Sequence, residues 1–335
     1  ADLKKADPDL FHASPECKAF STVTTAAARE KRGCLDMDFV NAIIKAIKVA
    51  KPKNISLENA PGYKTAGEYE MVPKIDKKTG KRILNKTTGK PVMTRVLKSN
   101  TEGLYYKKII KALDDEGYSH RTDKANVADY GGAASRDRLY IRASRVHDLN
   151  TPEFDLPPMS SPKNWWEEIK DLIPGAKVET DNWRTLKGDN GEPLVGIESV
   201  KKAVREGKVT DTAPIWYNGD GSNTRPPAVK NIFSHKTTPK YNKGDVTPIP
   251  AIVSSPQKAR ILMPDGRSIL VTPRMLARLQ GLPDSFKLPG NFYDAKAVVG
   301  NGMHTIMTDL LIRPMLAKTP LSLVGEGVEG GTAKL

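Results

Sequence analysis

Apolar residues in the first half of the chain recur with helical spacing in two segments. Those before position 51 fall three or four residues apart, which predicts a helix that ends at Lys51 and Pro52. A second helix is predicted over residues 105–118, where the apolar face stops at Gly117. The residues that form these two faces are Phe39, Val40, Ile43, Ile44, Ile47, Tyr106, Ile109, Ile110 and Leu113.

Short apolar runs between the helices have the composition of strands. They lie at residues 7–13, 54–59 and 138–144, and residues 21–30 are typical of a further helix. Strand and helix thus alternate, which is typical of an open, mostly parallel α/β sheet. Sheets of this kind carry their chemistry in the loops at the carboxyl ends of the strands. We therefore expect the loops after 7–13 and after 54–59 to open on the same edge.

The α/β pattern breaks in two places. Residues 63–100 contain two similar pieces, KKTGK and KTTGK, with Gly at turn positions between β-prone runs, which predicts a small β insertion. Residues 146–245 are irregular and rich in Pro, Gly, Asn and Trp, which indicates a separate, smaller domain. Regular elements return with a strand-like run at 248–255, a hairpin at 259–272 and a helix at 273–281.

Composition adds a strong positive charge to this picture. The 335 residues include 53 Lys or Arg against 39 Asp or Glu, a net charge of +14, which attracts polyanions, nucleic acid first among them. Part of the excess is concentrated in residues 74–98, which hold nine Lys or Arg and one Asp. This segment is either a solvated basic loop or a nucleic-acid contact.

The cysteines and the hydropathy restrict the possible classes. We expect Cys17 and Cys34 to be free thiols, because two cysteines in a chain of this length do not make a disulfide framework. No Cys or His spacing matches a metal site, so no metal is expected. No apolar run reaches the roughly 20 residues that span a bilayer, and no signal-peptide core is present at the start. A soluble intracellular protein without a membrane partner is expected.

Five segments, in order, resemble the motifs of the cytosine-5 DNA methyltransferases of phage and bacterial type. SPECKAFS, around Cys17, resembles the nucleophile loop, LENAPGY the Glu-Asn motif, and NVADYGGAASRDRLYI the motif with paired arginines. TPRMLARLQGLPDSF and VVGNGMHTIM resemble the last two motifs. Taken alone, Cys17 is more simply explained as an inert packing residue. The resemblance instead implies methyl transfer from S-adenosylmethionine to C5 of a flipped cytosine in double-stranded DNA, as in restriction-modification systems.

The resemblance implies a role for each of five residues. Cys17 corresponds to the nucleophile that adds to C6 of cytosine, which makes C5 an enamine carbon able to accept a methyl group. Glu58 corresponds to the glutamate that hydrogen-bonds and protonates N3, and Asn59 beside it orients the loop. Arg138 supplies positive charge near the base, with Arg136 beside it. In the family this pair contacts the target cytosine and the DNA backbone.

Two positions depart from the family pattern. Glu16 replaces a proline of the nucleophile loop, and Ala134 or Ser135 replaces a glutamine of the arginine motif, which affects loop contacts and not bond making. Residues 146–245 lie where the family has its target recognition domain, which reads bases in the major groove. The polar and aromatic side chains available there are Asn218, Asn223, Arg225, Trp165, Trp166, Trp183 and Trp216. Aromatic residues of this kind more often form a core than contact bases.

The cofactor site implied by the resemblance is incomplete in this sequence. Asn301 and Gly302 correspond to the motif that closes over the methionine end of S-adenosylmethionine, and Pro15 to a neighbouring position in the nucleophile loop. The family's Gly-rich cofactor loop has no counterpart before Asp9. A shortened chain, a second polypeptide that supplies the cofactor motifs, or a permuted half that begins at residues 321–331 would explain this. A flexible tail is the simpler interpretation of the last segment.

The sequence thus predicts an α/β protein with an incomplete Rossmann-like S-adenosylmethionine-dependent methyltransferase sheet and a smaller, irregular target recognition domain. The predicted parts are a catalytic domain at 1–145 with the insertion at 63–100, a recognition domain at 146–245, a return to the catalytic domain at 246–318, and a flexible tail at 319–335. Two other functions remain open. They are a tRNA cytosine-5 methyltransferase and a non-catalytic DNA-binding subunit of a split methyltransferase.

Overall fold

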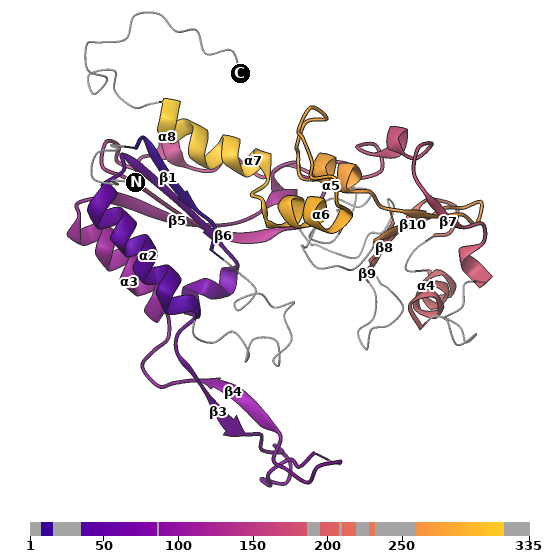
Figure 1. The fold of residues 1–335 in the computed structure, drawn as a ribbon, viewed down its shortest axis with the longest axis horizontal. Coiled ribbons are helices and arrows are strands. Elements are labelled where there is room, and N and C mark those ends of the chain that lie inside the picture. Colours follow the sequence, from indigo (N-terminus) through magenta and orange to yellow (C-terminus); the bar gives the residue numbers. More distant parts are fainter. Residues whose placement is uncertain are drawn as a thin grey trace, which may run out of the picture. The chain divides into compact units, whose positions relative to one another are not determined.

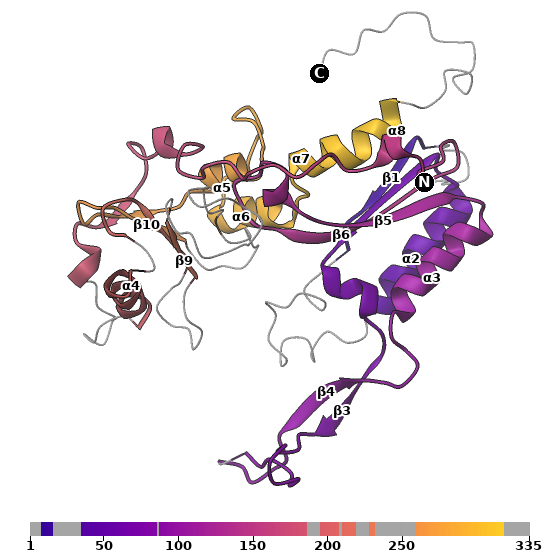
Figure 2. The ribbon, with the colours of Figure 1, turned by 180° about the vertical axis from the view of Figure 1, so that it is seen from behind.

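The structure of the chain is a computed structural model that divides into two compact units (Figures 1 and 2). It describes residues 8–15, 35–85, 87–185, 195–207, 210–218, 228–231, 249 and 259–317. The first unit comprises Ala1–Ala125, Arg138–Leu156 and Leu311–Leu335, and the second comprises Asn126–Asp137 and Pro157–Leu310. This division does not show which segment reads bases, so the domain assignment made from the sequence stays a prediction.

A four-stranded sheet with two helices packed on one face forms the centre of the first unit (Figure 1). The strands, in their order across the sheet, are β1 (Leu10–Ala13), β2 (Asn54–Asn59), β6 (Asp137–Ser144) and β5 (Ser119–Asn126). The helices are α2 (Leu35–Ala50) and α3 (Leu104–Asp115). The predicted α/β class is confirmed, as are the helices predicted before Lys51 and at 105–118 and the strands at β1, β2 and β6. The helix predicted at 21–30 lies outside the described residues.

The strand directions differ from the expectation of a mostly parallel sheet. β1 and β2 run parallel, with Leu10 opposite Asn54. β2 and β6 run antiparallel, with Asn59 opposite Leu139, so the expectation was wrong for β6. The reason is the connection: β6 follows β5 through a loop without a crossover helix, and such a connection returns the chain in the opposite direction.

The core of the first unit lies between the sheet and the two helices. Alternate residues of β2 and β6 face the helices, and the apolar residues predicted to form helix faces pack against them, except Phe39, which is exposed. The fully enclosed members are Val40, Ile43, Ile47, Ile55, Leu57, Tyr105, Ile109, Leu113, Leu139, Ile141 and Ala143. After α3 the chain turns at Gly117, where φ is 74°. The hydroxyl of Tyr118 then donates to the carbonyl of Pro52 at 2.6 Å, which ties the start of β5 to the loop before β2.

A buried ion pair joins the two strands β6 and β5. Arg142 is completely buried and donates through Nε and Nη2 to Oδ2 of Asp123, at 3.0 Å and 2.8 Å. Nη2 also donates to the carbonyl of Phe154 at 2.9 Å. Burial lowers the pKa of Arg142, and the charge of Asp123 opposes that shift. Since an unpaired charge at this depth is costly, the carboxylate is a condition for placing an arginine here.

A long β hairpin leaves the first unit between β2 and α3 and extends away from the sheet (Figures 1 and 2). Its strands are β3 (Tyr69–Pro73) and β4 (Met93–Leu97), which pair antiparallel. The turn glycines of the two repeated pieces, Gly80 and Gly89, have φ values of 68° and 65°. The predicted β insertion with turns at these positions is confirmed.

The second unit has a five-stranded sheet and several short helices. The strands, in their order across the sheet, are β7 (Val178–Thr180), β11 (Ser268–Leu270), β10 (Arg260–Leu262), β8 (Ile215–Asn218) and β9 (Ala228–Asn231). The α-helices are α4 (Val195–Arg205), α5 (Pro273–Leu279), α6 (Phe292–Asn301) and α7 (Thr305–Met307). β10 and β11 form the hairpin predicted around Gly266, and Thr272 caps the helix predicted after it.

Short helical turns complete the described chain. The 3₁₀ turns are η2 (Pro61–Thr65), η3 (Val127–Asp129), η4 (Pro152–Phe154), η5 (Lys170–Leu172) and η6 (Trp183–Thr185). A π-helical turn, η7 (Thr308–Ile312), leads into α8 (Arg313–Ala317). No helix in the described part of the chain is long and apolar enough to cross a membrane. The described residues also contain no group of three potential metal-binding side chains.

The tryptophans of the second unit belong to its core. Trp165, Trp183 and Trp216 are buried, and Trp165 meets Trp216 edge to face with 5.6 Å between ring centroids. Trp166 packs against the same cluster. These aromatic side chains therefore stabilise the unit, as the interpretation of them as core residues predicted. The side chain of Asn218, and all of Asn223 and Arg225, lie outside the described residues.

Candidate active site

Two strand ends meet at one edge of the first unit's sheet. Glu58 and Asn59 end β2, and Ser14 and Pro15 follow β1 directly. Because β1 and β2 are parallel, these ends lie side by side, and the hydroxyl of Ser14 donates a hydrogen bond to Oε2 of Glu58. The prediction that both loops open on the same edge is confirmed as far as Pro15.

Arg138 reaches the same edge because β6 runs antiparallel to β2. Glu58 stands opposite Tyr140, and Arg138 lies two residues before Tyr140, so it is a diagonal neighbour of Glu58 on the same face. Its Nε lies 2.5 Å from Oε1 of Glu58. The side chains of Arg138 and Glu58 are 14% and 2% exposed, so the ion pair is largely removed from solvent. Groups from both neighbouring chain segments thus fix the orientation of this carboxylate.

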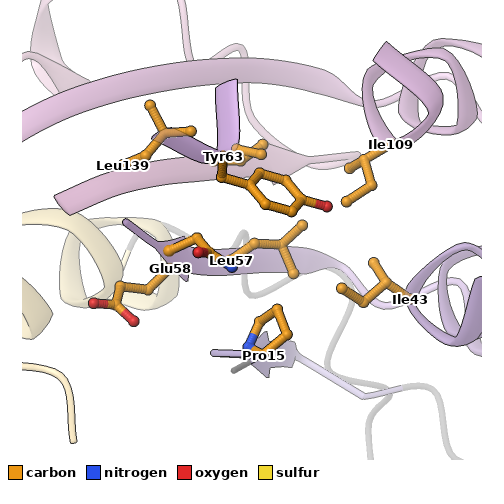
Figure 3. Close-up of a pocket in the computed structure, with 9 residues that line it drawn as sticks. Pro15, Ile43, Leu57, Glu58, Tyr63, Ile109 and Leu139 are labelled. Carbon is orange, nitrogen blue, oxygen red and sulfur yellow. The ribbon is translucent and has the colours of Figure 1, made fainter. Parts of the chain in front are cut away.

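A pocket opens beside Glu58 (Figure 3). Its lining is mostly apolar and consists of Pro15, Ile43, Leu57, Glu58, Asn59, Tyr63, Ile109, Leu139 and Ile141. Leu57 and Glu58 are consecutive strand residues and point to opposite faces of the sheet, as the close-up shows. The apolar part of the pocket is therefore the end of the core under the helices, and the carboxylate of Glu58 lies across the strand from it.

Asn59 orients the loop that follows β2. Its Oδ1 accepts from the backbone N–H of Ala60 at 2.8 Å, and the residue is buried. This contact agrees with the orienting role that the sequence predicts. Its Nδ2 is also buried and makes no hydrogen bond within the described part of the chain. A buried amide donor is costly to leave unpaired, so this atom is a candidate ligand contact.

Cys17 lies outside the described residues, as do Glu16 and Cys34. The described chain stops at Pro15, which lines the pocket together with Glu58, and resumes at Leu35. The assignment of Cys17 as the nucleophile therefore stays a prediction. So does the assignment of Cys34 as a free thiol without a catalytic role.

Arg136 belongs to the second unit and has a different environment from Arg138. It is buried, and its Nη1 and Nη2 donate to the carbonyls of Gly300 and Gly302, at 2.9 Å and 3.1 Å. These carbonyls lie at the carboxyl end of α6, where the helix dipole favours a cation. Arg136 therefore ties the arginine motif to the last sequence motif, and its predicted contact with cytosine or DNA stays a prediction.

The loop before Arg136 is closed by Asn126, the first residue of its motif. Oδ1 of Asn126 accepts from the backbone N–H of Ala128 and of Arg136, both at 3.0 Å. Its Nδ2 donates to the hydroxyl of Ser135 at 3.0 Å. At Gly132 an added Cβ would lie 2.3 Å from Cγ1 of Val127, so only glycine fits there. The motif residues thus hold one compact loop.

The two residues that the sequence assigns to the cofactor differ in what they offer a ligand. The N–H of Gly302 donates to the carbonyl of Val298 at 3.1 Å, and its own carbonyl accepts from Arg136 and from Nε2 of Gln280, each at 3.1 Å. A carbonyl oxygen accepts two hydrogen bonds, so the backbone of Gly302 is fully used inside the unit. Asn301 is exposed at the end of α6, and its amide fits a polar ligand.

His304 gives the second unit an acid-sensitive contact. It is buried, and its Nδ1 accepts from the backbone N–H of Ile306 at 3.2 Å, which caps α7. Burial lowers the pKa of His304 from 6.5 to about 4, and the nearby positive charges of Arg136 and Lys163 act in the same direction. Below pH 6.5 the unfolded chain therefore binds a proton that the folded chain excludes until about pH 4.

We expect the second unit to lose about 2 kcal/mol of unfolding free energy between pH 7 and pH 5 because of His304. His304→Asn retains an oxygen that can cap the same N–H but has no titrating group, so its pH dependence over this interval should be smaller by that amount. All the tryptophans lie in the second unit, so urea unfolding followed by tryptophan fluorescence measures it. Equal pH dependence in the two proteins would contradict the prediction.

Sequence reasoning gave no role to three residues with structural contacts, Ser14 in the first unit and Asn126 and Gln280 in the second. Ser14 opens the nucleophile-loop motif but had no assigned role, although a hydroxyl directly after a strand end signals a contact at that edge. Asn126 and Gln280 were inside recognised motifs but had no assigned role. Gln280 donates to the carbonyls of Val299 and Gly302, both at 3.1 Å, so the helix motif at α5 and the last motif are joined.

The fold and the site define a class of protein, and the comparisons define its family. An α/β sheet with a buried carboxylate at the ends of its parallel strands is a common arrangement for a ligand site. The family model of the C-5 cytosine-specific DNA methylase matches residues 94–314, about two thirds of the chain. The chain belongs to the C-5 cytosine-specific DNA methylase family, which confirms the resemblance drawn from its motifs.

Solved structures of methyltransferases are similar to this chain at low identity. A methyltransferase of Entamoeba histolytica, EhMeth, has 13% identity and a TM-score of 0.46, and the match covers 93% of this chain and 78% of that one. A prophage-encoded E. coli protein, named as a DNA modification methyltransferase, has 16% identity, a TM-score of 0.46 and coverages of 93% and 79%. A DNMT2 variant of Spodoptera frugiperda has 13% identity and a TM-score of 0.44, and the match covers 93% of this chain and 81% of that one. A search of curated proteins gave no match.

Proposed function

We propose that this chain carries the cytosine-activating residues of a DNA cytosine-5 methyltransferase. The observation that carries the proposal is the carboxylate of Glu58, which is buried, held from both sides, and located at the strand edge that Pro15 enters. Two peptide units connect Pro15 to Cys17, so the two Cα atoms are at most about 7 Å apart. The proposal therefore assigns the thiol of Cys17 and the carboxylate of Glu58 to one reaction.

In the proposed reaction the thiolate of Cys17 bonds to C6 of cytosine. The electron pair of the C5–C6 double bond moves toward C5, and Glu58 stabilises this shift by hydrogen-bonding and sharing its proton with N3. C5 then accepts a proton from water or a methyl group from the donor. Loss of the original C5 hydrogen and expulsion of sulfur restore the ring, so Cys17 is regenerated.

The contacts of Glu58 leave room for this role. Oε1 is paired with Arg138 and Oε2 accepts from Ser14, and each carboxylate oxygen can accept two hydrogen bonds. The exocyclic amino group of cytosine can therefore donate to this carboxylate without displacing both partners, whereas N3, which only accepts, receives its proton from Glu58 once the carboxyl group has taken a proton from water. Arg138 and Ser14 position the carboxylate, and the buried Nδ2 of Asn59 is a further donor beside it.

S-adenosylmethionine is the proposed methyl donor, and when bound it supplies an electrophilic methyl group. Asn301 is the residue proposed to contact it, because its exposed amide can both donate and accept. Gly302 is proposed to contribute close backbone approach only, since its polar groups are used by Val298, Arg136 and Gln280. Pro15 and a second polypeptide with further cofactor contacts stay predictions.

The experiment that tests the proposal needs no methyl donor. Addition of the thiol to C6 makes C5 exchange its hydrogen with water, so duplex DNA of mixed sequence with tritium at cytosine C5 should release tritium in the presence of the chain. Cys17→Ser is expected to reduce the release to that of DNA alone, because serine is a far weaker nucleophile. Cys34→Ser is the matched control and should retain the wild-type rate.

The outcomes separate the alternatives left open by the sequence. Release from tRNA and not from duplex DNA would replace the DNA assignment by a tRNA one. Release that survives Cys17→Ser would remove the nucleophile assignment. A chain that binds duplex DNA but releases no tritium in any nucleic acid would be a binding subunit without this chemistry.

A further inference from the structure

The end of the β hairpin in the first unit is built from two similar nine-residue units. We call residues 74–92 the tip. The units are IDKKTGKRI at 75–83 and LNKTTGKPV at 84–92. Their second residues have the same role: Oδ1 of Asp76 accepts from the backbone N–H of Lys78 and Thr79, at 2.8 Å and 3.0 Å. Each unit therefore forms one side-chain-capped turn.

The second turn repeats the first in its hydrogen bonds. Oδ1 of Asn85 accepts from the backbone N–H of Thr87 and Thr88, both at 2.9 Å. In each turn the glycine N–H donates to the carbonyl of the capping residue, at 2.8 Å for Gly80 and 2.9 Å for Gly89. Lys81 and Lys90, which directly follow the two turn glycines, therefore start from turns with the same hydrogen-bond pattern.

Hydrogen bonds close the tip into a ring of three short extended segments. The N–H of Lys74 donates to the carbonyl of Val92 at 2.7 Å, and the N–H of Val92 donates to the carbonyl of Ile83 at 2.8 Å. The N–H of Ile83 donates to the carbonyl of Lys74, again at 2.8 Å. Each segment therefore pairs with both others, which makes the tip a defined surface.

The hairpin is fixed where it leaves the unit. At Gly67 an added Cβ would lie 1.9 Å from the carbonyl oxygen of Thr101, so the two chain segments touch at that point. The N–H of Lys98 donates to the carbonyl of Glu68 at 2.9 Å, and the hydroxyl of Thr101 donates to the same carbonyl at 3.2 Å. The tip extends from this root away from the sheet (Figures 1 and 2).

The described cations of the tip lack carboxylate partners. The exposed basic residues described there are Lys74, Lys77, Lys78, Lys81, Arg82 and Lys90. Within the described chain, none of them forms an ion pair with a carboxylate, although exposed lysines elsewhere do, such as Lys111 with Asp115. The one carboxylate of the tip, Asp76, serves as a turn cap, and N–H donors from Thr79 and Lys78 lower its pKa.

Apolar side chains accompany these cations. Ile75, Leu84 and Met93 are 48%, 54% and 45% exposed. Ile75 and Leu84 are the first residues of the two units, so each turn follows an exposed aliphatic residue. A surface of unpaired cations with a few aliphatic side chains is complementary to a phosphate backbone and its sugars, which carry regular negative charge and apolar edges.

We propose that the tip binds the phosphate backbone of duplex DNA and reads no sequence. This inference rests on the proposed function, because it takes duplex DNA to be the substrate of the chain. It adds a contact surface outside the catalytic edge. Lysines that contact phosphates release counterions, so their contribution appears in the salt dependence of affinity.

The test compares two variants with equal changes in charge. In the tip variant, glutamine replaces Lys77, Lys78, Lys81 and Lys90. In the control variant, glutamine replaces exposed lysines of α2 and α3, namely Lys45, Lys48, Lys108 and Lys111. Affinity for a mixed-sequence duplex is measured from low to moderate salt. Each lost phosphate contact should reduce the slope of log affinity against log salt by roughly 0.9.

We expect the tip variant to lose a slope of at least about 2 and the control variant less than about 1. At 0.1 M salt each lost contact also weakens binding roughly tenfold. Equal slopes for the tip variant and the wild type would overturn the inference. A second variant, with residues 74–92 replaced by Asn-Gly to link the paired Pro73 and Met93, should behave like the tip variant.

Tritium release separates failure of this inference from failure of the proposed function. An unchanged slope with normal release would remove the DNA contact of the tip and leave the catalytic proposal standing. A reduced slope without release in the wild type would retain the contact and remove the catalytic proposal. If Ile75→Ser with Leu84→Ser abolished an interaction with a protein while the slope was unaffected, the tip would be a protein-docking surface and the inference would be wrong.

Discussion

Glu58→Gln is expected to slow tritium release from cytosine C5 by roughly 10²–10⁴-fold, with little change in affinity for duplex DNA. Glutamine has nearly the same shape and can still hydrogen-bond N3, but it has no proton to share as sulfur adds to C6. The rate is measured at saturating DNA, and duplex affinity is measured separately. A change confined to affinity would show that Glu58 binds the base without activating it.

A matched control for this variant comes from the same unit. Glu102→Gln removes an exposed carboxylate outside the candidate site, so its release rate should stay within about twofold of the wild type. Arg138→Lys retains positive charge beside Glu58 but loses the planar guanidinium, so it should lower the rate less than Glu58→Gln does. A Glu58→Gln rate equal to that of Glu102→Gln would contradict the role of Glu58.

Asp123→Ala is expected to destabilise the first unit by about 3–5 kcal/mol. The substitution leaves the guanidinium of Arg142 buried without its carboxylate partner, and the carbonyl of Phe154 cannot compensate the charge. Far-ultraviolet circular dichroism in urea follows this unit together with the other. Tryptophan fluorescence, which reports the second unit, should show a smaller change.

Two comparisons make this prediction specific to a buried charge. Asp115→Ala breaks the exposed ion pair with Lys111 and should cost less than about 1 kcal/mol. Adding Arg142→Met to Asp123→Leu removes both charges and should recover most of the loss, because a buried pair replaced by apolar residues is often neutral. If the double replacement were as unstable as Asp123→Ala, lost packing and not an unpaired charge would be the cause.

Helices and buried strands of the first unit were predictable because their apolar residues are numerous and regularly spaced. Val40, Ile43 and Ile47 mark α2, and the apolar run of β2 is bounded by polar residues. β5 was not predicted. Its sequence, SHRTDKAN, contains one small apolar residue, and as an edge strand it needs no apolar face.

The direction of β6 could not be read from its residues. Strand propensity is the same for either direction, and the direction follows from the connection to β5, which was itself missed. The ion pair between Glu58 and Arg138 depends on that direction and on the register. The resemblance placed both residues in one site, but their contact required the antiparallel pairing of β2 with β6.

Loop contacts at the site were the least predictable part. Asn126 accepts from the backbone N–H groups of Ala128 and Arg136 within its own loop, and Gln280 donates to the carbonyls of Val299 and Gly302 in another segment. No side-chain pattern encodes a partner that is a backbone atom. Sequence reasoning therefore recognised the motifs without finding what each polar residue holds.

The contact between Gly67 and Thr101, where the hairpin leaves the first unit, makes the stability of that unit nearly independent of the length of the tip. Gly67 and Thr101 hold the two ends of the excursion together, so a longer excursion between them adds only a small closure penalty. Since residues 75–92 of the tip are two nine-residue units, tandem duplication of one unit would add a capped turn with its lysines at a distance from the central sheet. The length of polyanion that the hairpin can contact would then depend on the number of nine-residue units, which can change without any change at Glu58.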